Sequence, residues 1–192
     1  VATTKGYSTQ LSVMYLLALY FGEARKTITE QEMIDYIQKL KKVPDDVQKL
    51  LKFEERIKIL AKQYAHSKDV FVIGRGIDYA AALEGSLKLK EISYIHSEAY
   101  AAGELKHGTI SLITEGVPVI AIATQESVYA KMISNIREVR ARGALVILIT
   151  QEGVEVEPSI YNYHLTIPKL PDEFTPIPTA VLLQLIAYYT SV

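Results

Sequence analysis

The sequence contains no cysteine, has a formal net charge of only −1 and has no long hydrophobic run. Without cysteine, this chain can have no disulfide, no thiolate metal site and no cysteine nucleophile, and it fits a reducing compartment, so we expect a cytoplasmic protein. The low charge gives no electrostatic reason to expect binding to nucleic acid or to an anionic membrane. The longest apolar run, residues 11–21, is too short to span a bilayer and lacks signal-peptide features.

Helical patterns occupy the first third of the chain, before any strand signal. Residues 9–24 are strongly apolar, and residues 29–40 are amphipathic after the capping-box pattern TEQE. Residues 44–65 alternate charged side chains with Leu and Ile at helical spacing. These patterns predict three helices in front of a sheet, so we expect a helical lead-in of residues 1–65 followed by an α/β unit of residues 66–192.

Short apolar runs rich in Val and Ile follow the helical segment. Such runs are apolar on both faces, as the strands of a buried parallel sheet must be. The predicted strands are 70–73, 117–123, 145–149 and 163–167, with a further short strand at 95–99. The predicted helices between and after them are 78–94, 127–142 and one from about residue 179. This alternation predicts a doubly wound, flavodoxin-like α/β fold: a parallel sheet with helices on both faces, preceded by the N-terminal helices.

Three charged residues share one face of the helix predicted after the first strand. Glu84, Lys88 and Glu91 stand at positions i, i+4 and i+7, which coincide on a helix of about 3.6 residues per turn. The helix should start at the C-terminal edge of the sheet, where open α/β folds bind ligands. Ala and Leu residues surround the charges, which predicts partial burial. From the pattern alone, a solvated ladder of ion pairs and a proton-transfer site are equally well supported.

Other polar features have simpler interpretations. The segment 74–76, Gly-Arg-Gly, would suit a phosphate, but Tyr79 occupies the last glycine position of the dinucleotide fingerprint, so a tight turn is favoured. A lone histidine such as His107 is more often a surface residue than a catalyst. The other histidines have no partners at metal-ligand spacing, so we predict no metal site. Hydroxyl side chains gather near the start of the first helix, where N-capping would explain them: Thr3, Thr4, Ser8 and Thr9.

The segment 82–108, ALEGSLKLKEISYIHSEAYAAGELKHG, closely resembles the isomerase domain of the glucosamine-6-phosphate synthase family. These proteins are the glutamine:fructose-6-phosphate aminotransferases that open hexosamine biosynthesis. Segments 1–5 (VATTK), 135–143 (NIREVRARG) and 182–188 (LLQLIAY) resemble the same family. The resemblance therefore covers the chain from end to end and is far more specific than a lone glycine motif.

The family combines an N-terminal glutaminase domain with two sugar isomerase (SIS) subdomains, and this chain resembles the second SIS subdomain. The resemblance implies the SIS fold for residues 66–192. It also implies that the glutaminase domain, the first SIS subdomain with its phosphate-binding loop and the C-terminal tail with its imine-forming lysine are absent from this chain. The sequence lacks an initial methionine and ends within an apolar helical pattern. We therefore expect a fragment of a larger protein.

The resemblance assigns catalytic roles to the charged helix face. Glu91 matches the family's general base, which moves a proton between C1 and C2 of the sugar. Lys88 matches the lysine that stabilises charge on the enolic intermediate, and Glu84 matches the carboxylate that orients this lysine. An aldose–ketose shift needs such a base and such a cation, so the residue types agree with the implied chemistry.

Further implied features lie outside that face. His107 matches the histidine that assists ring opening and reaches into the neighbouring subunit of a homodimer, and Val1 and Ala2 match a stretch that lines the sugar pocket. The implied ligands are fructose-6-phosphate and glucosamine-6-phosphate, the implied partners are the other domains of the enzyme, and no metal or nucleotide cofactor is implied. Two alternatives stay open, namely a fructosamine-phosphate deglycase and a non-catalytic module that senses phosphosugars.

Overall fold

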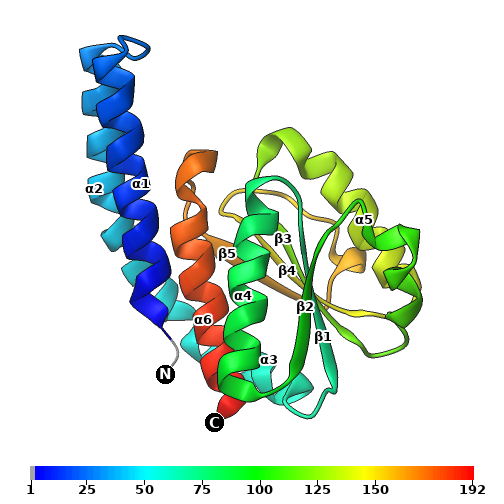
Figure 1. Cartoon of the computed structure of the whole chain (residues 1–192). Coiled ribbons are helices and arrows are strands. Elements are labelled where there is room, and N and C mark those ends of the chain that lie inside the picture. Colours follow the sequence, from blue (N-terminus) through cyan, green and yellow to red (C-terminus); the bar gives the residue numbers. More distant parts are fainter. Residues whose placement is uncertain (1–2) are drawn as a thin grey trace.

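Five parallel strands form the sheet at the centre of the α/β unit (Figure 1), in a computed structural model that describes residues 3–192. The strands are β1 (Asp69–Gly74), β2 (His96–Ala101), β3 (Pro118–Ala123), β4 (Leu145–Gln151) and β5 (Tyr163–Ile167). Their order in the sheet is β2-β1-β3-β4-β5. This is the flavodoxin-like order, so the predicted fold class is confirmed, and the expected short strand after residue 94 is the edge strand β2.

Both faces of the sheet are covered because the side chains of each strand alternate between two cores. On β1, Val70 and Val72 point into one core while Phe71 and Ile73 point into the other. The first core is closed by α3 (Glu54–Tyr64), α4 (Ile77–Ser93) and α6 (Pro176–Ser191). The second core is closed by α5 (Tyr129–Ala141), which lies on the opposite side in Figure 1. Every residue of β3 is buried, which explains its continuous apolar run.

The first two helices, α1 (Thr4–Ala24) and α2 (Glu30–Leu50), form a hairpin that projects beyond the sheet (Figure 1). The predicted capping box at the start of α2 is present: the side chain of Thr29 accepts from the backbone N–H of Glu32, and the Glu32 carboxylate accepts from the N–H of Thr29. None of the described helices is both long enough and apolar enough to cross a membrane. Short 3-10 turns join the main elements: η1 (Leu51–Phe53), η2 (Leu105–His107), η3 (Thr109–Leu112), η4 (Glu126–Val128), η5 (Pro158–Ile160) and η6 (Asp172–Phe174).

The predicted break between the second and third helices is wrong in position. The hydrophobic spacing places it at residues 40–44, and proline usually disfavours a helix interior. Instead, α2 continues through Pro44 to Leu50, and the break lies in η1. Val43 is buried against Phe174 and Ile177, and apolar residues on both sides of the proline pack on the same cluster. This packing holds the helix together across the hydrogen bond that Pro44 cannot make.

Candidate active site

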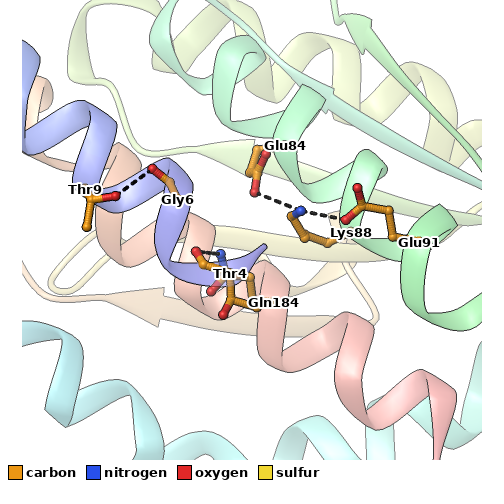
Figure 2. Close-up of polar contacts among 7 residues, drawn as sticks. All are labelled: Thr4, Gly6, Thr9, Glu84, Lys88, Glu91 and Gln184. Carbon is orange, nitrogen blue, oxygen red and sulfur yellow. Dashed lines mark hydrogen bonds and ion pairs between the residues drawn. The ribbon is translucent and has the colours of Figure 1, made fainter. Parts of the chain in front are cut away.

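The three charged residues predicted to share a face of α4 are joined by ion pairs. Lys88 Nζ lies 2.6 Å from Glu91 Oε2 and 3.7 Å from Glu84 Oε1 (Figure 2). We call Glu84, Lys88 and Glu91 the carboxylate row. The lysine bridges one carboxylate a turn before it and one a turn after it, as the spacing predicts.

Burial is graded along the carboxylate row. The side chain of Lys88 is 4% exposed, that of Glu84 is 12% exposed and that of Glu91 is 36% exposed. A solvated ladder would leave all three side chains in water, so the predicted partial burial is present. Glu91 combines a short charge-assisted hydrogen bond with access to solvent, which is what a group that must meet a ligand requires.

A glycine explains how the row becomes buried. A Cβ added at Gly85 would lie only 2.6 Å from Leu183 Cδ1, so the absence of a side chain lets α6 approach α4 closely. Leu183 is itself buried in the core on this face of the sheet. The close approach of α6 removes water from the face of α4 that carries Lys88.

The electrostatics of the row are perturbed at Glu84. Burial raises the pKa of Glu84 above its usual value, with a further contribution from Glu91, while the nearby Lys88 opposes the shift. One carboxylate oxygen of Glu84 is fully buried and has no hydrogen-bond partner among the described residues. Burial also raises the pKa of Tyr7 on α1, and the charge of Glu84 adds to this effect. The first turns of α1 therefore lie within electrostatic range of the row.

The start of α1 lies beside the row and is held by α6 (Figure 2). Gln184 Nε2 donates a hydrogen bond of 3.0 Å to the backbone oxygen of Thr4. The expected N-capping is wrong, because Thr3 makes no side-chain capping bond and Thr9 donates back to the carbonyls of Lys5 and Gly6. Val1 and Ala2, which the family resemblance assigns to the sugar pocket, lie outside the described residues.

His107 is not brought to the carboxylate row within this chain. It ends η2, in the segment that follows the edge strand β2, and its side chain is exposed. Within residues 3–192, no side-chain hydrogen bond or ion pair joins His107 to Glu84, Lys88 or Glu91.

The Gly-Arg-Gly segment forms a filled turn rather than an open cradle for phosphate. Gln125 donates to the backbone oxygen of Arg75 at 2.7 Å, and its side chain covers Gly76, where a Cβ would meet Gln125 Oε1 at 3.0 Å. The Arg75 guanidinium is turned aside to Asn135, at 2.7 Å. Asp78, at the start of α4, is buried and accepts from the N–H of Thr124 at 2.8 Å. Sequence patterns gave no sign of these partners.

The carboxylate row does not lie at the edge of the sheet where ligands were expected. Helix α4 does start there, directly after Gly76, but Glu84 and Glu91 stand about 10 and 20 Å further along the helix axis. A hollow of about 520 Å³ occupies the edge instead, between the segments that follow β3, β4 and β5. Within the described part of the chain, no group of three or more His, Cys, Asp or Glu side chains is placed to hold a metal ion. The row therefore stands on the flank of α4, between α6 and the start of α1.

Sequence reasoning missed the residues that support the row from other elements. Gln184 and Leu183 come from α6 and Tyr7 comes from α1. Only the glycine in the middle of an otherwise helical pattern, Gly85, signals a close approach in the sequence, since glycine is unfavourable within a helix.

Known proteins resemble the chain over its whole length. A segment of the glutamine–fructose-6-phosphate aminotransferase (isomerizing) of Caldanaerobacter subterraneus subsp. tengcongensis is 51% identical over 192 residues, which are 100% of this chain and 32% of that protein. The solved C-terminal domain of glucosamine-fructose-6-phosphate aminotransferase from Francisella tularensis superposes with a TM-score of 0.94 at 33% identity, covering 100% of this chain and 54% of that one. The chain thus spans about a third of the length of the curated relatives it matches.

A more distant structure shares the fold alone. The tagatose-6-phosphate ketose/aldose isomerase of Escherichia coli matches with a TM-score of 0.64 at 21% identity, over 77% of this chain and 41% of that one.

Residues 63–192 match the SIS domain family. This match covers most of the chain and includes the whole sheet and the carboxylate row. The chain therefore belongs to the SIS domain family.

Proposed function

We propose that this chain is the second SIS subdomain of a longer glutamine–fructose-6-phosphate aminotransferase. In that protein, residues 1–65 form the helical lead-in, residues 66–192 form the SIS unit, and the carboxylate row converts fructose-6-phosphate and glutamine-derived ammonia to glucosamine-6-phosphate. The observation that carries the proposal is the nearly buried Lys88, held between two carboxylates of unequal exposure. The 51% identity to a curated aminotransferase of this kind supports the choice of substrate.

Each residue of the row has a chemical task in the proposed reaction. The imine formed from the ketose and ammonia must lose a proton from C1 and gain one at C2, while the hydroxyl on C1 gives up its proton and the imine nitrogen takes one up. Glu91, the most exposed member of the row, acts as the base that moves this proton through an enolic intermediate. Lys88 stabilises the negative charge that develops on the enolic oxygen, and it is effective because little water competes for it.

Glu84 acts through Lys88 rather than on the sugar. Its carboxylate is mostly buried and lies 3.7 Å from the lysine nitrogen, so it compensates the cation and fixes its direction. Burial raises the pKa of Glu84, so this carboxylate takes up a proton at a higher pH than an exposed glutamate does. Protonation would remove the negative charge that compensates Lys88.

The remaining parts of the proposed enzyme lie outside this chain. They are the glutaminase domain, the first SIS subdomain with its phosphate-binding loop, and a second copy of the protein whose His107 assists ring opening. Exposed apolar side chains on α1 support the presence of such partners, because soluble proteins seldom leave a large contiguous apolar patch in water. The large apolar side chains exposed on α1 are Val13, Met14, Leu16, Leu17, Tyr20 and Phe21. The lack of cysteine supports a cytoplasmic enzyme.

The test is Glu91→Gln in the full-length protein, followed by the formation of glucosamine-6-phosphate from fructose-6-phosphate and glutamine. Loss of the base should reduce kcat by about 10²- to 10⁴-fold while KM for the sugar changes little. Glu23→Gln, at an exposed position near the end of α1, is the matched control and should retain wild-type kinetics. Unchanged turnover in Glu91→Gln would refute the catalytic role of Glu91, whereas sugar binding without turnover in the wild-type protein would favour a phosphosugar-sensing module.

A further inference from the structure

We propose that Gln184 is a positioning residue, which holds the first turn of α1 against the carboxylate row and thereby sets the affinity for the sugar. The inference rests on the proposed function, since it concerns substrate binding at the same row. Nothing in the catalytic chemistry requires Gln184, because it lies on α6 and its amide is turned toward α1 rather than toward the row (Figure 2).

Helix α1 is anchored by partly buried side chains that pack on the cluster around α2 and η6 and by few polar contacts, so each polar contact matters. It contains no buried residue among those described, and Thr3 does not cap its start. Two side-chain hydrogen bonds join it to segments that follow β5. Tyr15 Oη donates to the backbone oxygen of Glu173, and Gln184 Nε2 donates to the backbone oxygen of Thr4 at 3.0 Å. The second of these is the one at the end of α1 nearest the row.

Consecutive residues of α6 connect α1 to α4. Leu183 packs against Gly85, so closely that a Cβ there would lie 2.6 Å from its methyl carbon, and Gln184 holds Thr4. Gly85 directly follows Glu84 in the row. A short covalent path in α6 therefore links the backbone of α1 to the backbone that carries the row, and Gln184 is the polar half of this link.

The position of the α1 start matters to the row electrostatically as well as sterically. The charge of Glu84 contributes to the raised pKa of Tyr7, one turn into α1. In Figure 2, Thr4 lies on the side of α4 toward which Glu84 and Lys88 project. If the tether is lost, this wall of the site moves, which weakens contacts to the ground state and the transition state alike. Such uniform binding appears in KM and not in kcat.

The experiment compares two substitutions of Gln184 in the full-length protein. Gln184→Met keeps the length of the side chain and removes the donor, whereas Gln184→Lys keeps an N–H donor of sufficient reach. A hydrogen bond of this kind corresponds to about a two- to tenfold effect on binding. We expect Gln184→Met to raise KM for fructose-6-phosphate by about fivefold with kcat within about twofold, and Gln184→Lys to restore most of the affinity.

A matched control and a second readout separate this inference from the proposed function. Gln63→Met, at an exposed site on α3, should leave both kinetic constants unchanged. Amide hydrogen exchange over residues 8–12, whose N–H groups bond to the carbonyls of the first turn, should accelerate in Gln184→Met and not in Gln63→Met, whether or not the enzyme turns over. A wild-type KM together with unchanged exchange in Gln184→Met would overturn the inference. Lack of turnover in the wild-type protein would refute the proposed function, and the exchange rates would still decide whether Gln184 holds α1.

Discussion

Replacing Lys88 with methionine should destabilise the chain through the carboxylate that is left behind. The methionine side chain would fill much of the same space with apolar atoms, so the methylene packing is largely kept. The two carboxylates respond differently, because Glu91 is 36% exposed and can be hydrated, whereas Glu84 is 12% exposed. The loss should therefore come mainly from Glu84, which would be buried without a cation.

The expected magnitude follows from this asymmetry. Removing one partner of a fully buried pair costs about 3–5 kcal/mol. Here the closer partner is accessible to water and the buried one is 3.7 Å away, so we expect about 2–3 kcal/mol at pH 7.5. Without Lys88 the pKa of Glu84 should rise further above that of the unfolded chain. The folded variant then binds more protons than the unfolded one, so the loss should shrink as the pH falls toward 5.

Urea and thermal unfolding of Lys88→Met and wild type at pH 7.5 and pH 5 measure this loss. At the higher pH the melting temperature should fall by roughly 4–12 °C for a chain of this size. Lys58→Met is the matched control, because that lysine bridges Glu54 and Glu55 on the exposed side of α3 and should leave the urea midpoint almost unchanged. Adding Glu84→Gln to Lys88→Met should recover much of the lost stability. A loss that does not depend on pH, or that Glu84→Gln fails to relieve, would refute the reasoning.

Two further predictions concern the same helix–sheet unit. Gly85→Ala should lower the free energy of unfolding by about 1 kcal/mol, since overpacking against Leu183 outweighs the gain in helix propensity. When Leu183 is also replaced by alanine, urea unfolding should no longer show this loss. An equal loss of stability with and without Leu183→Ala would contradict the overpacking. Burial raises the pKa of Asp78, so the folded chain binds more protons than the unfolded one and stability should decline as the pH rises from about 4 through the folded pKa. Asp78→Asn should lack this decline in a pH series of urea midpoints, and an unchanged slope would assign it to another group.

Local patterns predicted most elements because the forces that form them act over short stretches of chain. The run 163–167 coincides with β5, and the capping box before α2 is present as written in the sequence. The exception is informative. Pro44 lies inside α2 because Val43 and its neighbours pack against Phe174, which is far along the chain. A local rule was overruled there by contacts between distant segments.

The sequence by itself determined the class of sheet and the shared face of Glu84, Lys88 and Glu91, because strand burial and helical spacing are periodic properties of neighbouring residues. Only the tertiary structure decided how deeply each member of the row is buried. That depends on α6 meeting α4 at Gly85 and on Gln184 holding the start of α1, about 100 and 180 residues away in sequence from their respective partners. The burial of a helix face depends on which segments pack against it, and the spacing of residues along one helix does not show which distant segments those are.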